Sequence, residues 1–273
     1  MLPNAILFDL DDTLFDHHRA TTRALRVLHA EYAHGIDFAT FADKHADVLE
    51  EFHQHFLSGQ FTLDQARIAR MKVLFAAFGR PMDDLTARRA ARLYREQHQA
   101  NRAVVPGARE LLEALRGQVK LGIVTNNSTL EQHEKLRALE IAHYFDTIVI
   151  SEDVGATKPD RRIFGIALER AGAKAEETVF VGDSWQNDVL GAIDSGIAAV
   201  WFNRDGKTET QALERRADKK RLERSAAAGV SQSIPVELRS FTPLSTALSA
   251  IRKAFKNRTP GVTKNEQLET LAP

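Results

Sequence analysis

An apolar run that leads directly into a group of carboxylates lies close to the start of the chain. Residues Ala5 to Phe8 are all apolar, and Asp9, Asp11 and Asp12 follow within four residues. Consecutive apolar residues without alternation are typical of a strand buried on both faces, as in a parallel sheet covered by helices. In such sheets, ligands bind just beyond the carboxyl ends of the strands. The stretch therefore predicts an α/β fold with a polar site at the sheet edge, or else a turn whose carboxylates only hydrogen-bond the backbone.

Length and charge limit the classes of function. The 273 residues allow a large core and one smaller domain, and 37 basic residues balance 37 acidic ones. A neutral chain has no global field that would attract a nucleic acid polymer, and the absence of cysteine excludes disulfides, thiolate metal sites and a cysteine nucleophile. Neither a secretory leader nor an apolar run of membrane-spanning length is apparent. We expect a soluble, cytoplasmic protein without a membrane partner.

The segment 17–99 is helical in character throughout. Apolar residues recur at helical spacing, and breaks fall near Gly35, at Ser58-Gly59 and at Gly79-Arg80-Pro81. We expect about four helices that form a bundle inserted after the first strand. Six of the ten histidines lie here, and solvated helix positions are expected for them rather than a metal site: His29, His34, His45, His53, His55 and His98.

After Val105 the pattern alternates between helix and strand, which predicts a Rossmann-like parallel sheet with helices on both faces. Strands are expected at 119–124, 147–150, 178–181 and 198–202, and helices at 108–116, 130–139, 161–171 and from 185 to 195. The predicted core comprises 1–16 and 100–255. Within it, the charged insertion 204–233 is expected to be a solvated helix or loop, with a basic docking surface as the alternative. A last edge strand at 236–241, a helix at 244–255 and a disordered tail at 256–273 complete the prediction.

Polar residues follow four of the predicted strands. They are Asp9 and Asp11, Thr125 and Asn126, Lys158, and Asp183 with Asp188. Since the carboxyl ends of parallel strands meet at one edge of a sheet about 4.8 Å apart, these residues are expected to lie together. Four carboxylates, one ammonium and one hydroxyl suit a divalent cation and a phosphoryl group. Taken singly, Thr125 could equally cap the next helix, and Lys158 could be a solvated loop lysine.

The order of these motifs from residue 5 to about 203 resembles the haloacid dehalogenase superfamily. The motifs are Asp9-Leu10-Asp11-Asp12-Thr13, Thr125, Lys158-Pro159 and the segment from Gly182 to Asp188. The helical segment resembles the α-helical cap of the first type in that family. Residues 149–160 look most like the branch of small-phosphomonoester phosphatases, which includes 5′-nucleotidases and acylneuraminate 9-phosphatases. The segment 204–233 has no counterpart in this resemblance.

The resemblance implies a Mg²⁺-dependent phosphatase that acts through an aspartyl-phosphate. Asp9 would be the nucleophile and a metal ligand, Asp11 the general acid and base, and Asp183 a second carboxylate ligand. The carbonyl of Asp11 would also bind the metal. Thr125, the N–H group of Asn126 and Lys158 would bind the phosphoryl group. For Asp188 three roles stay open: binding the metal through water, holding Lys158, or occupying the first turn of a helix.

Other functions remain as alternatives. A 2-haloacid dehalogenase would need no acid at position 11, because that reaction has no leaving alkoxide to protonate. A sugar phosphomutase would need to keep water from the aspartyl-phosphate, and a non-catalytic binding module would not need all five residues (Asp9, Asp11, Thr125, Lys158 and Asp183). The expected partner is a small phosphorylated metabolite, with monomer and homodimer both open.

Overall fold

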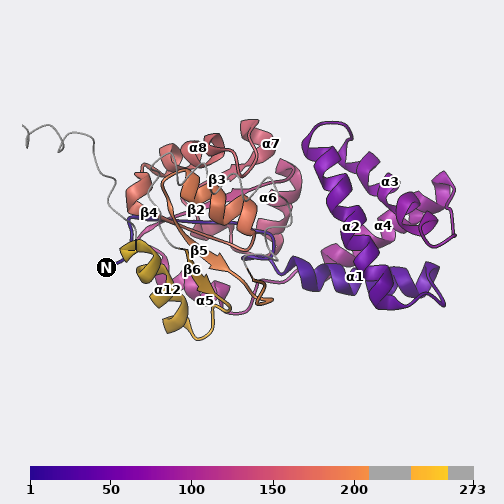
Figure 1. Cartoon of the computed structure of the whole chain (residues 1–273), viewed down its shortest axis with the longest axis horizontal. Helices are drawn as coiled ribbons and strands as arrows, with labels where there is room; N and C mark the ends of the chain where they lie inside the picture. Colours follow the sequence, from indigo (N-terminus) through magenta and orange to yellow (C-terminus); the bar gives the residue numbers. More distant parts are fainter. Residues whose placement is uncertain (209–234, 258–273) are drawn as a thin grey trace, which may run out of the picture. The chain divides into compact units, whose positions relative to one another are not determined.

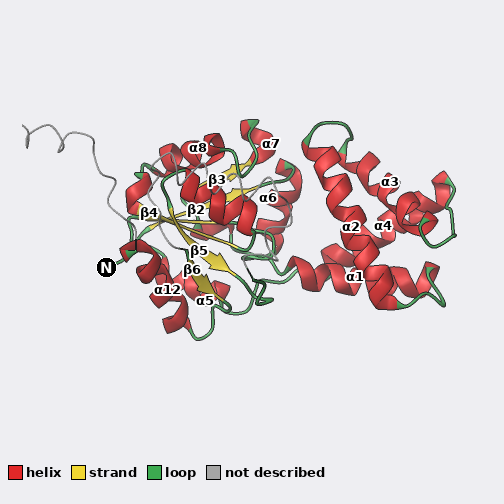
Figure 2. Ribbon diagram, in the orientation of Figure 1, coloured by secondary structure: helices red, strands yellow, loops and turns green. Residues whose placement is uncertain are grey.

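The computed structural model describes residues 1–208 and 235–257, and it contains a six-stranded, wholly parallel sheet (Figures 1 and 2). The strand order is β3-β2-β1-β4-β5-β6. The strands are β1 (Ala5–Phe8), β2 (Lys120–Thr125), β3 (Thr147–Ile150), β4 (Thr178–Gly182), β5 (Ala198–Phe202) and β6 (Val236–Leu238). All four residues of β1 are fully buried, as expected for a central strand without alternation.

Helices cover both faces of this sheet, as Figure 1 shows. Helix α8 (Arg161–Ala171) packs on β2 and β3 and contacts the short helix α9 (Gly191–Asp194). On the opposite face, α12 (Leu244–Lys256) packs on β4, β5 and β6 and contacts α5 (Ala108–Leu115). The shorter helices are α7 (Ser151–Val154), η1 (Ala142–Tyr144), η2 (Ala175–Glu177) and the π-helix η3 (Trp185–Leu190).

The chain divides into two compact units. The core unit comprises residues 1–14, 105–129 and the described residues from 140 onward, and it contains the sheet. The helical unit comprises residues 15–104 and 130–139. Its helices are α1 (His17–Tyr32), α2 (Phe38–Leu57), α3 (Leu63–Ala76), α4 (Asp84–Ala100) and nearly all of α6 (Thr129–Ala138).

Local sequence explains where the helices of the helical unit begin. The side chains of Asp37, Thr62 and Asp83 each accept a hydrogen bond from the backbone N–H group three residues ahead, which satisfies a donor that the first turn leaves free. At Thr62, Gln65 completes a capping box. The apolar faces of these helices then pack on one another around buried side chains that include Leu28, Phe41, Leu74, Phe75 and Ala87.

The predicted α/β fold with helices on both faces of a parallel sheet is confirmed. The helix expected from 185 to 195 differs in detail, because it starts as a π-helix and becomes α-helical only at Gly191. Residues 209–234, and with them most of the expected insertion, lie outside the described residues, as does the tail from residue 258. No helix in the described ranges combines the length and apolar character needed to cross a membrane.

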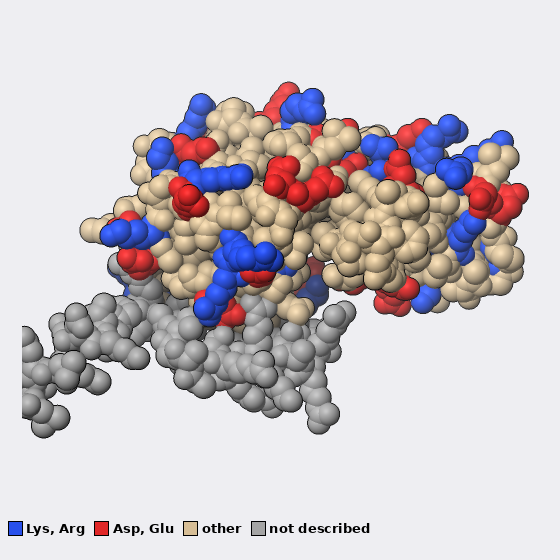
Figure 3. Space-filling model, turned by 90° about the horizontal axis from the view of Figure 1, so that it is seen from above, with Lys and Arg blue, Asp and Glu red and all other residues tan. Residues whose placement is uncertain are grey.

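The expectation of solvated histidines in the helical unit is wrong for His45. Its side chain is 1% exposed, because it faces the inside of the bundle next to Tyr94 rather than solvent. The helical period alone does not distinguish a polar residue on the buried face from one on the exposed face. Basic and acidic side chains are interspersed on the face of the described residues that Figure 3 displays, in keeping with the balanced composition.

One half-buried acidic residue, Glu131, pairs with several arginines of the helical unit. Glu131 on α6 forms ion pairs with Arg67 (2.7 Å), Arg95 (3.5 Å) and Arg102 (3.9 Å). Burial by itself would raise the pKa of Glu131, but the charge and hydrogen bond of Arg67 outweigh it and hold the pKa below its usual value. A carboxyl group with a lowered pKa stabilises the fold above its unfolded-state pKa and loses that contribution as the pH falls through its folded-state pKa.

We therefore predict that Glu131→Gln lowers the free energy of unfolding by about 1.5–3 kcal/mol at pH 7, since charged hydrogen bonds are lost. The difference from wild type shrinks as the pH falls below the folded-state pKa of Glu131, where both side chains are neutral. Urea unfolding of both proteins, followed by circular dichroism between pH 3 and 8, measures this difference in the free energy of unfolding. Glu134→Gln is the control, because Glu134 lies 4.0 Å from Arg102 and is more exposed. An equal effect of both variants, or a difference independent of pH, would contradict the prediction.

Candidate active site

The parallel register brings the predicted polar residues to one edge of the sheet. Phe8, the last residue of β1, lies between Ile123 of β2 and Val181 of β4. Asp9 follows it, and its N–H group donates to the carbonyl of Val181 (2.9 Å). Thr125 closes β2 and is buried, and Asp183 follows β4. Residues far apart in the sequence thus share one end of three adjacent strands.

Lys158 is buried (4% exposed) and lies between two carboxylates. Its Nζ donates to Oδ1 of Asp9 and to Oδ1 of Asp188, at 2.6 Å in each case. Both charges raise the pKa of the Lys158 ammonium against the opposite effect of burial, so it stays protonated. Of the roles left open for Asp188, the structure contains direct contacts for two: Asp188 pairs with Lys158, and it lies in the first turn of η3.

The side chain of Asn126 fixes the backbone of Lys158. Its Nδ2 donates to the carbonyl of Lys158 (2.9 Å), and its Oδ1 accepts from the N–H group of Lys158 (2.8 Å). The sequence suggested only a backbone contribution from Asn126, because nothing in its spacing indicates a pairing with a residue 32 positions later.

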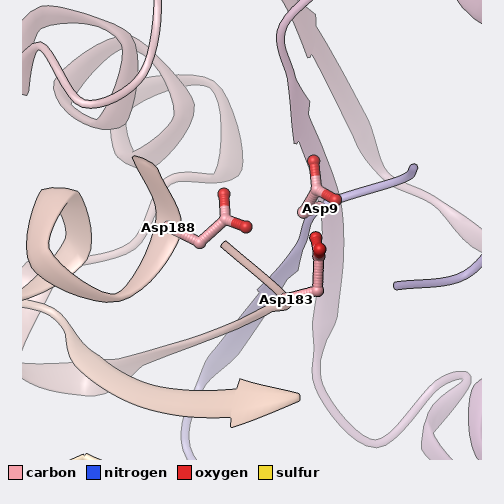
Figure 4. Close-up of side chains that lie close together, drawn as sticks. All are labelled: Asp9, Asp183 and Asp188. Carbon is pink, nitrogen blue, oxygen red and sulfur yellow. The ribbon is translucent and has the colours of Figure 1, made fainter. Parts of the chain in front are cut away.

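Three carboxylates converge at this edge: Asp9, Asp183 and Asp188 each offer an oxygen atom within 4.8 Å of the others (Figure 4). Burial raises the pKa of Asp9 to about 7 despite Lys158, and the neighbouring carboxylates add to the rise. Burial, followed by the charges of Asp9 and Asp188, raises the pKa of Asp183 well above its usual value. One ammonium is therefore too little positive charge for three close carboxylates.

This surplus of negative charge fits a divalent metal ion. Mg²⁺ binds carboxylate and carbonyl oxygens, usually through one or two carboxylates with water in the remaining positions. Asp9 and Asp183 could supply those carboxylates while Asp188 stays paired with Lys158. Asp11 is half-buried and does not belong to this carboxylate group, so it is separate from the groups that could hold the ion through their side chains.

Two contacts that the sequence did not indicate hold the backbone of Asp183. Its N–H group donates to the hydroxyl of Thr13 (3.1 Å), and its carbonyl accepts from the indole N–H group of Trp201 (2.9 Å). Thr13 belongs to the first motif, whereas Trp201 lies on β5, which carries none of the predicted site residues. Trp201 lies opposite Gly182 in the pairing of β4 with β5, and this register is what places the indole next to the backbone of Asp183.

Asp188 is held by the start of the π-helix. Its Oδ2 accepts from the N–H group of Ser184 (2.9 Å), and the hydroxyl of Ser184 accepts from the N–H group of Asn187 (3.2 Å). The closeness of the carboxylate requires glycine at position 182. A Cβ atom there would lie 2.5 Å from Cβ, Cγ and Oδ2 of Asp188, closer than non-bonded atoms can approach.

Comparison with known proteins identifies the family. The family model for haloacid dehalogenase-like hydrolases matches residues 3–196. HAD-hydrolase YfnB of Bacillus subtilis is 31% identical over 204 residues, which cover 74% of this chain and 85% of that protein. Glyceraldehyde 3-phosphate phosphatase of Pyrococcus abyssi is 31% identical, with 72% and 80% covered. Pyrimidine 5′-nucleotidase YjjG of Escherichia coli is 41% identical, but over only 40% of this chain and 49% of that protein.

A solved structure agrees with these relatives. The magnesium-bound crystal structure of YfnB from Bacillus subtilis has a TM-score of 0.69 and 26% identity, with 91% of this chain and 100% of that chain covered. The fold and the matches together define a hydrolase built on a parallel sheet covered by helices. The chain belongs to the haloacid dehalogenase-like hydrolase family. The resemblance inferred from the sequence is thereby confirmed, together with the expectation of an enzyme of the phosphatase type.

Because Gly182 leaves space for Asp188, we predict that Gly182→Ala displaces the Asp188 carboxylate and deprives Lys158 of one partner. A displacement of about 1 Å at such a site can reduce turnover about 10²-fold. Hydrolysis of p-nitrophenyl phosphate and thermal unfolding are the measurements.

The matched control is Gly165→Ala. This glycine lies inside helix α8, and a Cβ atom there would contact nothing within 4 Å. Inside a helix, alanine is more favourable than glycine by about 1 kcal/mol, so the Gly165→Ala protein should be more stable than wild type and equally active. Full activity of Gly182→Ala would show that Asp188 does not need its present position.

Proposed function

We propose that the protein is a Mg²⁺-dependent phosphatase that hydrolyses small phosphomonoesters through an aspartyl-phosphate on Asp9. The observation that carries the proposal is the buried ammonium of Lys158 bonded to Asp9, next to two further carboxylates at the carboxyl edge of a parallel sheet. A carboxylate nucleophile, a fixed cation and a place for a metal ion are the parts that phosphoryl transfer to an aspartate requires.

The residues would divide the reaction into two displacements. The carboxylate of Asp9 attacks phosphorus, and the bond from phosphorus to the ester oxygen breaks as Asp11 gives that oxygen its proton. In the second step Asp11 removes a proton from water, the resulting hydroxide attacks phosphorus, and the bond to Asp9 breaks. Thr125, the N–H group of Asn126 and Lys158 would stabilise the charge on the transferring group.

The metal ion would supply positive charge that lets an anionic substrate approach two carboxylates. Asp9, Asp183 and the carbonyl of Asp11 are the proposed ligands. Without a cation, burial raises the pKa of Asp9 to about 7, so a large share of the protein at neutral pH carries a protonated, non-nucleophilic Asp9. A cation beside Asp9 would lower that pKa and favour the ionised form.

The proposed substrates are nucleoside monophosphates or sugar phosphates. Relatives named as a pyrimidine 5′-nucleotidase and as glyceraldehyde 3-phosphate phosphatases support this class. We propose a cytoplasmic enzyme whose partner is a small phosphorylated metabolite. A second candidate is haloacid dehalogenation, since the structure of the 2-haloacid dehalogenase of Pseudomonas syringae pv. Tomato DC3000 matches with 26% identity and a TM-score of 0.54.

The test is a panel of nucleoside monophosphates, sugar phosphates and 2-haloacids, each with Mg²⁺ and after treatment with a chelator. We expect phosphate release that requires Mg²⁺. Asp9→Asn should reduce it by about 10³-fold or more, since the nucleophile is lost. Asp11→Asn should reduce it by about 10²–10⁴-fold, the usual contribution of general acid catalysis. Turnover of 2-haloacids with no phosphate release would overturn the proposal.

Two controls separate chemistry from folding. Burial raises the pKa of Asp9, so in metal-free buffer its ionised form destabilises the fold increasingly as the pH rises toward 7. Asp9→Asn should therefore unfold at the same urea concentration as wild type, or a higher one, at pH 8. Asp12→Asn should keep most of the activity, because Asp12 has a positive φ of 61°, a conformation that asparagine tolerates.

A further inference from the structure

The helical unit contains a partly buried polar cluster to which α1, α2, α3 and α4 contribute. His17 and Thr21 come from α1, His45 from α2, Arg70 from α3, and Tyr94 and His98 from α4. The ring of Tyr94 lies at the centre. The His45 ring lies 5.1 Å from it, the His98 ring stacks on it at 6.0 Å, and the Arg70 guanidinium lies over its face at 5.0 Å.

Part of this cluster is satisfied internally. The hydroxyl of Tyr94 donates to Thr21 (3.3 Å), and Thr21 is bonded in turn to Nε2 of His17 (3.2 Å). Nδ1 of His17 lies 3.3 Å from Nε2 of His98. These contacts hold the Tyr94 ring in place and orient it as a platform beneath the guanidinium of Arg70.

Two buried polar groups in the cluster have no such partner. His45 is 1% exposed and Arg70 is 9% exposed. Nε2 of His45 and Nε of Arg70 are both buried without a hydrogen-bond partner among the described residues. No carboxylate in the described ranges forms an ion pair with Arg70, whereas Arg67, one turn earlier on the same helix, pairs with Asp64 and Glu131.

The charges around these groups are of one sign. Burial lowers the pKa of His45 well below its usual value, and the positive charges of Arg70, His17 and His98 act in the same direction. Burial also lowers the pKa of Arg70, which the phenol of Tyr94 opposes and the charge of Arg67 reinforces. No carboxylate is among the groups that shift the pKa of His45 or Arg70, so the cationic charge at this cluster has no compensating anion among the described residues.

An unpaired buried arginine is costly, and an apolar residue of similar volume usually gives a more stable fold. We propose that Arg70, together with His45 and Tyr94, forms a binding site for an anionic oxygen group, a carboxylate or a phosphate, within the helical unit. The planar guanidinium presents N–H groups that match two oxygens of such a group, and Nε2 of His45 can add a third donor in the appropriate tautomer. Arg70 is 9% exposed and Tyr94 is 6% exposed, so neither side chain is completely closed off from solvent.

The anionic group has two possible sources with the same chemistry. It can be a second anionic group of the substrate, in which case the inference rests on the proposed phosphatase function. It can also be a free anion that regulates the helical unit, which requires no particular reaction. The experiment therefore has one arm that measures binding and one arm that measures turnover.

The binding arm compares wild type with Arg70→Met, which keeps most of the volume and removes the charge. Without ligand, Arg70→Met should unfold at a higher temperature than wild type, by about 2 °C or more. Malonate or inorganic phosphate in metal-free buffer should raise the wild-type unfolding temperature by about 3 °C more than that of Arg70→Met. Anions that bind elsewhere stabilise both proteins equally and cancel in this comparison.

Arg67→Met is the matched control in this arm. It removes a paired arginine from the same helix, so it should be destabilised without ligand and should keep the wild-type response to the anion. Arg70→Lys is the second variant. It keeps the charge but loses the planar fork, so its response should fall between wild type and Arg70→Met.

The turnover arm uses two esters that differ in one group: 3-phosphoglycerate, with a carboxylate, and glycerol 3-phosphate, with an alcohol. If the group belongs to the substrate, Arg70→Met reduces kcat/KM for 3-phosphoglycerate by about 10-fold or more and leaves glycerol 3-phosphate unchanged, since charged hydrogen bonds are lost. If the anion raises the unfolding temperature through Arg70, but Arg70→Met does not distinguish the two esters, the site is assigned to a free anion. Equal responses of wild type and Arg70→Met in both arms would overturn the inference, even if the phosphatase function holds.

Discussion

The surplus of negative charge at the carboxyl edge of the sheet is the constraint on which the candidate site depends. Asp9, Asp183 and Asp188 lie within 4.8 Å of one another and share one ammonium, that of Lys158. Burial and mutual repulsion make such an arrangement unfavourable by itself, as the raised pKa values of Asp9 and Asp183 indicate. It becomes favourable when a cation is present, and the fold supports it with fixed contacts. Asn126 holds the backbone of Lys158, while Thr13 and Trp201 hold that of Asp183.

A parallel sheet can assemble this group because its register is rigid. Phe8 at the end of β1 lies opposite Ile123 on one side and Val181 on the other. The carboxyl ends of β1, β2 and β4 therefore lie side by side. Lys158 and Asp188 come from elements outside the strands and need their own supports. Those supports are local: hydrogen bonds from Asn126 and Ser184, and the missing Cβ atom of Gly182.

The fold was accessible from the sequence because its elements carry strong local signals. The uninterrupted apolar strands and the alternation after Val105 identify a parallel sheet, and the glycine breaks separate α1 to α4. The hydrogen bonds that hold the site residues in place could not be predicted from the sequence. Trp201 looks like any core residue of a buried strand, and only the three-dimensional register reveals its hydrogen bond to Asp183. His45 was misjudged for a related reason, because the helical period does not reveal that a polar residue lies on the buried face.

The two units carry unbalanced buried charges of opposite sign. At the sheet edge of the core unit, carboxylates exceed cations, whereas in the helical unit Arg70 has no carboxylate partner among the described residues. A chain selected only for stability would replace either group with apolar side chains, since burying charge without compensation weakens the fold. Arg67 on the same helix does have a carboxylate partner, Glu131. Arg95 and Arg102 also pair with Glu131, so Arg70 differs from these three arginines in having no carboxylate partner among the described residues, as expected for a position that binds an anion from outside the chain.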